Sequence, residues 1–166
     1  MIKISKVLVA TDFGLASDSA LNYGREFART FGATLHVLHV VERPIGWAGP
    51  EAAGIDFVSL QHDLEVAAGH TLDRLVTPED REQLKAVSVV RAGSSPAIEI
   101  VAYARDAAAD VIIMGTHGRG RVSQLLMGSV AEKVVRIAPC PVLTVRHPEH
   151  EFILPDALQV AQPARR

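Results

Sequence analysis

One glycine-rich segment carries the residues of this chain whose types and spacing are best suited to chemistry. It reads Gly115-x2-Gly118-x9-Gly128-Ser129 and directly follows the short apolar run 111–114. Because glycine lacks a Cβ, the backbone N–H groups around it can approach anionic oxygens closely, which suits a phosphate group. The same spacing also fits a surface loop in which the glycines only form turns, but the position directly after a buried strand favours a binding site.

The end of this segment should also begin a helix. Ser129 and Glu132 have the spacing of a capping box, so we predict a helix that begins at Ser129. The start of a helix offers unpaired backbone N–H groups and a partial positive charge, which together favour a bound anion. The Ser129 hydroxyl is a further candidate donor, and Arg119 and Arg121 are candidates for adding positive charge.

A second polar pair, Thr11-Asp12, follows the apolar run 7–10 near the start of the chain. An acid at this position could cap the next helix, line a ligand site, or do both. It is also the position of the phosphoacceptor in a receiver domain, which needs further acids and a lysine at neighbouring strand ends. The third and fifth predicted strands lead instead into residues 91–93 and Arg146, so we disfavour a receiver domain.

Several familiar sites are absent from the sequence or disfavoured by it. There is no Gly-x4-Gly-Lys-Ser/Thr loop, and no Gly-x-Gly-x-x-Gly motif follows the first strand, which argues against a P-loop ATPase and a nicotinamide dehydrogenase. His36 and His39 lie three apart in a predicted strand, so their side chains should point to opposite faces rather than bind one metal. Cys140 is expected to be a buried small residue. Trp47 lies in the loop after the second strand, and its role is left open between covering the site, covering a dimer interface and facing solvent.

Apolar periodicity predicts five strands that alternate with four helices. The strands are short continuous apolar runs at residues 7–10, 35–41, 86–91, 111–114 and 142–145. The helical pattern is found around residues 20–31, 57–75, 96–102 and 129–138. In the second helix, Leu60 and Leu64 are expected on the inward, apolar face.

This alternation predicts an α/β fold, a single three-layer α/β/α domain with a five-stranded parallel sheet in the order 3-2-1-4-5. In such a sheet, ligands bind at the carboxyl ends of the strands where the strand order reverses, which here lies between the first and fourth strands. The Thr11-Asp12 pair and the glycine-rich segment should therefore meet at one site.

The 166-residue chain suits one domain of ordinary composition, with 48% apolar and 22% charged residues and a formal net charge of -2. This balance offers no broad basic field for nucleic acid or an anionic membrane, and no stretch approaches the ~18 apolar residues of a membrane span. The amino-terminal apolar run is too short for a signal peptide, and the single cysteine favours a reducing compartment. We therefore expect a cytoplasmic protein.

Three stretches of the sequence follow a known pattern. They are the VLVATDF of residues 7–13, the LHVV of residues 38–41, and the MGTHG of residues 114–118 with Gly128-Ser129 and the PCPVL of residues 139–143. Together they resemble the universal stress protein family, in its ATP-binding branch. The glycine pattern with its nine-residue spacer is fairly specific, because family members that do not bind ATP typically lack it.

The resemblance implies a Rossmann-like fold that binds ATP with Mg²⁺, in a domain of residues 1–146 followed by a C-terminal extension of residues 147–166. Ala10, Thr11 and Asp12 would line the adenosine side, and the Val40 backbone would meet the adenine edge. The ribose and phosphates would be held by Met114, Gly115, His117, Gly118, Arg119, Gly128, Ser129 and Val130. The family also implies a homodimer, often through the last strand, here residues 142–146.

The function implied by the resemblance is that of a nucleotide-dependent regulator of the stress response, with no catalytic residue assigned. A slow ATPase or autophosphorylating enzyme is one alternative, with Asp12, His117 and Ser129 as candidates and Mg²⁺ bridging the phosphates. A nucleotide-free dimeric scaffold, in which the glycines are only structural, is the other. The absence of a P-loop lysine and of an evident general base favours the regulator.

Overall fold

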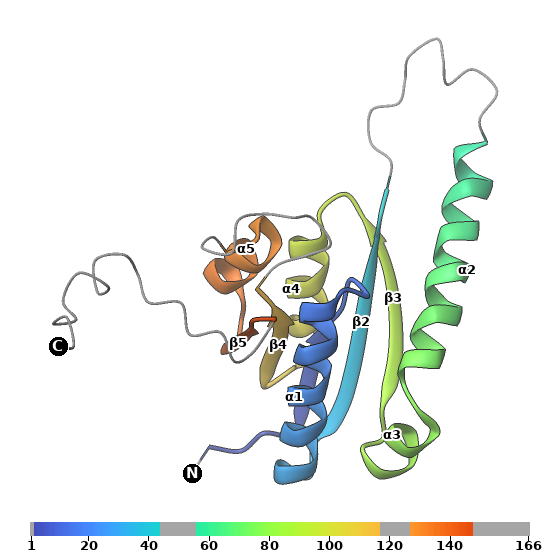
Figure 1. Ribbon diagram of the computed structural model, residues 1–166. Coiled ribbons are helices and arrows are strands. Elements are labelled where there is room, and N and C mark those ends of the chain that lie inside the picture. The colour runs from blue at the N-terminus through green and yellow to red at the C-terminus, as the bar shows by residue number, and fades with distance from the viewer. Residues whose placement is uncertain (1, 44–55, 117–126, 148–166) are drawn as a thin grey trace, which may run out of the picture.

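The computed structural model describes residues 2–43, 56–116 and 127–147, which form five strands and five helices (Figure 1). The strands are β1 Lys6–Ala10, β2 Thr34–Glu42, β3 Val87–Gly93, β4 Val111–Gly115 and β5 Val142–Val145. The helices are α1 Leu15–Phe31, α2 Phe57–Leu75, α3 Pro78–Gln83, α4 Pro96–Asp106 and α5 Ser129–Ile137. All five predicted strands are confirmed, and α3 is added to the four predicted helices.

The strands form one parallel sheet in the order β3-β2-β1-β4-β5, which confirms the predicted order. β1 lies at the centre, and at its carboxyl end Ala10 is aligned with Leu38 of β2 and with Met114 of β4. The chain first builds the sheet outward from β1 through β2 and β3, and then returns to add β4 and β5 on the other side. The strand order therefore reverses between β1 and β4.

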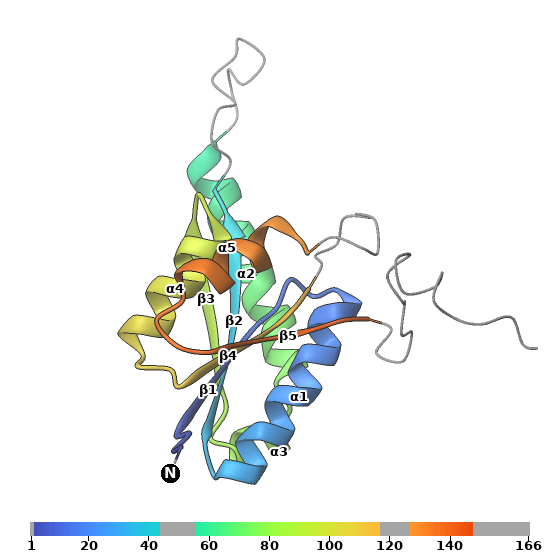
Figure 2. The same cartoon turned by 90° about the vertical axis from the view of Figure 1, so that its left-hand side faces the viewer.

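Helices cover both faces of this sheet (Figure 2). In β1, Val7 and Val9 join the core formed with α1 and α2, whereas Leu8 and Ala10 join the core formed with α4 and α5. Burial on both faces explains why the strands are continuous apolar runs. In the described part of the chain, no helix combines the length and the apolar character that crossing a membrane requires.

α1 packs directly on β1 because Gly24 leaves no side chain between them. A Cβ at Gly24 would collide with the Cγ2 methyl group of Val9. The helix is followed by Gly32, and the φ of 63° at this residue is a left-handed conformation that glycine adopts readily. This close packing holds the amino-terminal end of α1, and the turn that leads into it, at a fixed position over the sheet.

α2 departs from its predicted packing in its first half. The apolar spacing predicts an inward face that includes Leu60 and Leu64, but these residues are 42% and 43% exposed. Ala68 and Leu72 are the buried residues of this helix. Figure 1 shows the reason, because the first turns of α2 rise past the carboxyl ends of β1 and β4 and so lie beyond most of the sheet.

The apolar pattern gives no sign of the short helix α3, whose sequence PEDREQ contains no apolar face. Polar contacts hold this helix instead. Thr77 and Asp80 form a capping box, in which the Thr77 hydroxyl accepts the Asp80 N–H at 3.1 Å and the Asp80 carboxylate accepts the Thr77 N–H at 3.0 Å.

A buried ion pair joins α3 to α1. The Arg25 guanidinium donates from Nε to Asp80 Oδ1 at 3.0 Å and from Nη2 to Asp80 Oδ2 at 2.8 Å, and Nη2 also donates to the Leu75 carbonyl. Asp80 is only 2% exposed. Burial by itself would raise the pKa of the Asp80 carboxyl, but the hydrogen bonds from Arg25 and Thr77 outweigh burial and hold this pKa below its usual range.

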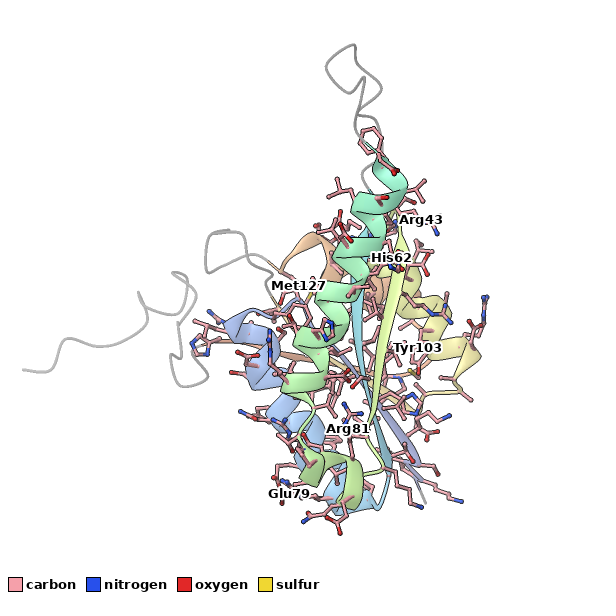
Figure 3. All side chains as sticks on the ribbon, turned by 90° about the vertical axis from the view of Figure 1, so that its right-hand side faces the viewer. Arg43, His62, Glu79, Arg81, Tyr103 and Met127 are labelled. Atoms are coloured by element: carbon pink, nitrogen blue, oxygen red, sulfur yellow. The ribbon has the colours of Figure 1, made fainter. Side chains whose placement is uncertain are left out.

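We expect Asp80→Asn to lower the free energy of unfolding by about 3 kcal/mol at neutral pH, because it leaves the Arg25 guanidinium without its counter-charge. Asp73→Asn is the matched control. Asp73 also pairs with an arginine, Arg81 of α3 (labelled in Figure 3), at 2.7 Å, but that pair is exposed. It should contribute less than about 1 kcal/mol. Denaturant unfolding followed by circular dichroism measures both changes.

The pH dependence gives a second check on the same pair. Because the folded-state pKa of Asp80 is lowered, its stabilisation is present above the ordinary aspartate pKa of about 4 and is lost as the pH falls through the folded-state pKa. The stability difference between wild type and D80N should therefore shrink on acidification. A difference that is absent at neutral pH, or that stays constant in acid, would contradict this role of Asp80.

Candidate functional site

A cavity of about 600 Å³ opens at the carboxyl ends of β1 and β4, where the strand order reverses. The ligand sites of open parallel sheets are found at this place, so the predicted location of the site is matched by a cavity. The wall is built from the ends of three strands and from parts of four helices. Its residues are Ala10, Thr11, Asp12, Ser17, Leu38, His39, Val40, Val41, Glu42, Leu64, Pro96, Ile100, Met114, Gly115, Thr116, Gly128, Ser129, Val130 and Ala131.

Most of the site residues predicted from the sequence meet at this cavity. Nine of the twelve lie in its wall: Ala10, Thr11, Asp12, Val40, Met114, Gly115, Gly128, Ser129 and Val130. The other three, His117, Gly118 and Arg119, lie outside the described residues, as do Trp47 and residues 148–166 of the C-terminal extension. The fold thus brings three separate segments of the chain to one place.

The turn from β1 into α1 places Asp12 at the cavity. Phe13 has a φ of 64°, a left-handed conformation that few residues other than glycine adopt, and it turns the chain just after the strand. The Asp12 carboxylate accepts the Gly14 N–H at 3.1 Å, but the N-cap residue of α1 is Gly14. The interpretation of Asp12 as the helix cap is therefore wrong, although its carboxylate does stabilise the turn.

Two buried hydroxyl groups hold this turn from inside. The Thr11 hydroxyl donates to Ser17 Oγ at 3.0 Å and accepts the Phe13 N–H at 3.0 Å, while the Ser17 hydroxyl donates to the Gly14 carbonyl at 2.8 Å. Thr11 is 6% exposed and Ser17 is 3% exposed. Both hydroxyl groups are thus engaged within the protein, so Asp12 is the polar side chain that this turn offers to a ligand.

The two histidines of β2 serve opposite faces of the sheet, as predicted. The Nδ1 atom of His36 lies 2.6 Å from the Tyr103 hydroxyl of α4, and burial lowers the pKa of His36. His39 lies on the α1 side, where its ring stacks on Phe13 with the centroids 4.2 Å apart. Within residues 2–43, 56–116 and 127–147, no group of three His, Cys, Asp or Glu side chains could hold a metal ion.

Gly115 lacks a side chain for a reason other than the predicted one. The sequence suggests that this glycine lets a backbone amide approach a phosphate group. In the structure, a Cβ at Gly115 would lie 2.9 Å from both the carbonyl carbon and the Cβ of Ala16. The glycine therefore makes room for the first turn of α1, and the close contact between β4 and α1 closes one side of the cavity.

The start of α5 presents three backbone N–H groups to the cavity. α5 begins at Ser129 as predicted, but its N-cap is Gly128 and no side-chain hydrogen bond caps it, so the predicted capping box led by Ser129 is wrong. The Gly128 N–H donates to the Thr116 carbonyl at 2.7 Å, which removes it from the expected ligand donors. The described part of the chain supplies no acceptor for the N–H groups of Ser129, Val130 and Ala131.

The side-chain charge of the cavity wall is negative where the structure describes it. Asp12 and Glu42 contribute carboxylates, and no lysine or arginine belongs to the described wall. Positive potential therefore comes from the start of α5. The lack of a lysine beside Asp12 in this part of the wall also argues against a receiver domain. The arrangement suits a ligand with an anionic group at α5 and with hydroxyl groups at the Asp12 carboxylate.

The cavity wall also contains residues that the sequence analysis missed. Glu42 and Pro96 could have been found, because both stand at the carboxyl edge of the predicted sheet, one ending a strand and the other opening a helix. Leu64 and Ile100 could not, because their apolar spacing is the same as that of any core-facing helical residue.

The fold and the site together define a doubly wound α/β domain, a class whose ligands bind at the point where the strand order reverses. The model of the universal stress protein family matches residues 3–146 of the chain. The chain belongs to this family.

Individual relatives agree with this assignment. Universal stress protein MJ0531 of Methanocaldococcus jannaschii is 31% identical over 157 residues, which cover 88% of this chain and 84% of that protein. The solved structure of MJ0577 from the same organism has a TM-score of 0.74 at 27% identity and covers 87% of this chain and 97% of that chain. A universal stress protein of Archaeoglobus fulgidus, solved in complex with dAMP, has the same fold, with a TM-score of 0.57 at 23% identity over 87% of this chain and 99% of that chain.

We expect Gly115→Ala to destabilise the domain by about 1–3 kcal/mol, because the new Cβ would press on the backbone of Ala16. Gly69→Ala in α2 is the matched control, since a Cβ there meets nothing within 4 Å. That change should be neutral or should stabilise by up to about 1 kcal/mol. Thermal unfolding measures both, and an unchanged melting temperature for G115A would show that β4 and α1 are not in close contact.

Proposed function

We propose that this protein binds ATP in the cavity at the ends of β1 and β4 and acts as a nucleotide-dependent regulator. The observation that carries the proposal is the set of three N–H groups at Ser129, Val130 and Ala131, for which the described residues supply no acceptor. Donors at a helix start need water or a ligand as partner. With the positive end of the helix dipole behind them, they suit phosphate oxygens.

The cavity suits a nucleotide in its size and in the order of its polar groups. Its volume of about 600 Å³ lies within the range of roughly 300–1,000 Å³ that is typical of small-molecule sites. We place the phosphates at the start of α5, the ribose hydroxyl groups at the Asp12 carboxylate, and the adenine between the Val40 backbone and Ile100 of α4. The phosphate side would be completed by Met114, Gly115, His117, Gly118 and Arg119.

The relatives support an adenine nucleotide over other anions. The Archaeoglobus fulgidus protein was solved with dAMP, and the glycine pattern from Gly115 to Ser129 in this chain resembles that of the ATP-binding branch. Mg²⁺ would neutralise part of the phosphate charge, and we propose that phosphate oxygens and water hold most of its coordination sites, as is usual for this ion.

Binding without rapid turnover is supported by what the sequence lacks. It contains no P-loop lysine motif to neutralise the charge that develops on a phosphoryl group during transfer, and it offers no evident general base. We therefore propose that nucleotide occupancy shifts the protein between two states, and that a partner reads the state. Phosphate release from ATP above buffer controls would instead assign a slow ATPase.

We expect Ser129→Pro to weaken ATP binding by about tenfold or more, because proline removes both a backbone donor and the hydroxyl group. Proline is tolerated at the first residue of a helix, and Gly128, with φ -62° and ψ 148°, already has the extended conformation that suits a residue before proline. Ser129→Ala removes the hydroxyl and keeps the N–H, so it separates the two contributions. Isothermal titration calorimetry with Mg-ATP measures the affinities.

Two results would count against this proposal. Equal affinity for ATP in S129P and wild type, with helix content unchanged by circular dichroism, would show that the start of α5 does not hold the phosphates. No binding heat for wild type at millimolar ATP would reject ATP binding altogether and leave the nucleotide-free scaffold.

We also propose that the protein forms a homodimer through residues 142–146. β5 is an edge strand that pairs, among the described strands, with β4 alone. The Thr116 N–H donates to the Val145 carbonyl, so Val145 faces β4 and, by alternation, Thr144 directs its N–H and C=O groups outward. An edge with outward donors and acceptors is a template for a second strand.

Thr144→Pro should convert such a dimer into a monomer. Proline removes the outward N–H of an edge strand without removing a bond to β4, so the domain itself should stay folded. Thr144→Ala keeps the N–H and is the matched control. Size-exclusion chromatography with light scattering gives the mass of each variant. A wild type that is monomeric, or a T144P variant that remains dimeric, would rule out this interface.

A further inference from the structure

We propose that His39 is a positioning residue for the nucleotide. Its imidazole donates a hydrogen bond to the Thr11 carbonyl, and this leaves the N–H and C=O groups of Val40 available to pair with the base. The inference rests on the proposed function, since it assigns the residue that prepares the adenine side of that site. The last backbone hydrogen bond between the β1 segment and β2 is the one that the Thr11 N–H donates to the Leu38 carbonyl at 2.9 Å.

Alternation along β2 decides which way the Val40 backbone faces. Leu38 bonds to β1, and Arg43 bonds to β3 through its N–H and the Gly93 carbonyl at 2.9 Å. Because the direction of the backbone groups alternates along a strand, Val40 must direct its N–H and C=O to the side of β1. β1 ends at Ala10, so these two groups open on the cavity, and Val40 belongs to its wall.

The natural acceptor for the Val40 N–H would be the Thr11 carbonyl, which is the next group along the ladder. The structure gives that carbonyl a different partner, the His39 Nδ1 atom at 2.8 Å. A carbonyl oxygen can only accept, so the imidazole must carry a proton on Nδ1. Among the residues that the structure describes, the Val40 N–H has no hydrogen bond on this side.

Phe13 holds the imidazole in the place where it makes this bond. The two rings stack with centroids 4.2 Å apart and planes at 27°. The left-handed φ of 64° at Phe13, two residues after Thr11, turns the chain away from the strand direction. The ladder therefore ends at Leu38 because the turn diverges and because the side chain of His39 completes the hydrogen bonding of Thr11.

The consequence is an adjacent donor and acceptor on one backbone residue at the cavity. Adenine presents the complementary pair on its Watson–Crick edge, the N1 acceptor and the N6 amino donor, whereas guanine presents a donor at N1 and an acceptor at O6. An open Val40 backbone therefore suits adenine, and a Val40 N–H that is bonded to Thr11 would lose this pairing.

The test compares three substitutions of His39 with a matched histidine control. His39→Leu removes the donor, His39→Asn places an amide N–H where Nδ1 was, and His39→Gln places it one carbon further away. His36→Asn is the control, because His36 lies on the opposite face of β2 and outside the cavity wall. Two quantities are measured: the hydrogen-exchange rate of the Val40 amide without nucleotide, by NMR, and the dissociation constant for Mg-ATP, by calorimetry.

In wild type, H36N and H39N, the Val40 amide should exchange fast, and the ATP affinities should agree within about threefold. In H39L and H39Q, the Val40 N–H should pair with the Thr11 carbonyl, so its exchange should slow and ATP binding should weaken about tenfold or more. An ATP affinity that H39N keeps and H39L loses would show that the hydrogen bond to Thr11, and not the packing of the imidazole ring, is what matters. Should H39L fail to fold, H39Q against H39N makes the same comparison.

Two outcomes would overturn the inference: a Val40 amide that is already protected in nucleotide-free wild type, or ATP binding by H39L and H39Q that equals that of wild type. Either result leaves the proposed function standing if wild type binds ATP. A wild type that does not bind ATP removes the proposed function, and the exchange rates still report whether His39 keeps the Val40 backbone open.

Discussion

Backbone hydrogen bonding is interrupted where β1 and β4 end, and the organisation of the site depends on how that interruption is resolved. Buried N–H and C=O groups are almost always paired in proteins, so each group at this edge needs a partner. Thr116 and Gly128 are paired within the protein, and the Thr11 carbonyl is paired with His39. Among the described residues, donors without a protein acceptor stand at Val40 and in the first turn of α5. They surround one cavity, and this juxtaposition is the physical basis for proposing a nucleotide there.

Close packing of α1 on the sheet gives this edge its shape. Glycine at position 24 lets α1 approach β1, and glycine at position 115 lets the end of β4 approach Ala16. The buried pair of Arg25 and Asp80 then ties α1 to the segment between α2 and β3. The helix that begins beside Asp12 is thus held at several points along its length, and most of the described cavity wall stands on strands and helices.

The sequence predicts the fold well because buried parallel strands are continuous apolar runs, and the strand order then fixes where a site can lie. It predicts the chemistry less well, since one signal has several physical causes. The missing Cβ of Gly115 serves helix packing, and the Ser129–Glu132 spacing fits a capping box although the helix is capped one residue earlier. The bond of His39 to Thr11 depends on a turn that the sequence does not reveal. The cytoplasmic location and the role of residues 147–166 stay predictions.

The central claim is that unpaired amides at the edge of the sheet bind the nucleotide. The most direct test is a titration of the ¹⁵N-labelled protein with Mg-ATP, followed by NMR at the backbone amides. The account predicts saturable shifts and slower hydrogen exchange at Val40, Ser129, Val130 and Ala131, with a smaller change at Gly128, whose N–H is already bonded. Amides at these four residues that stay unchanged while others respond to ATP would contradict it.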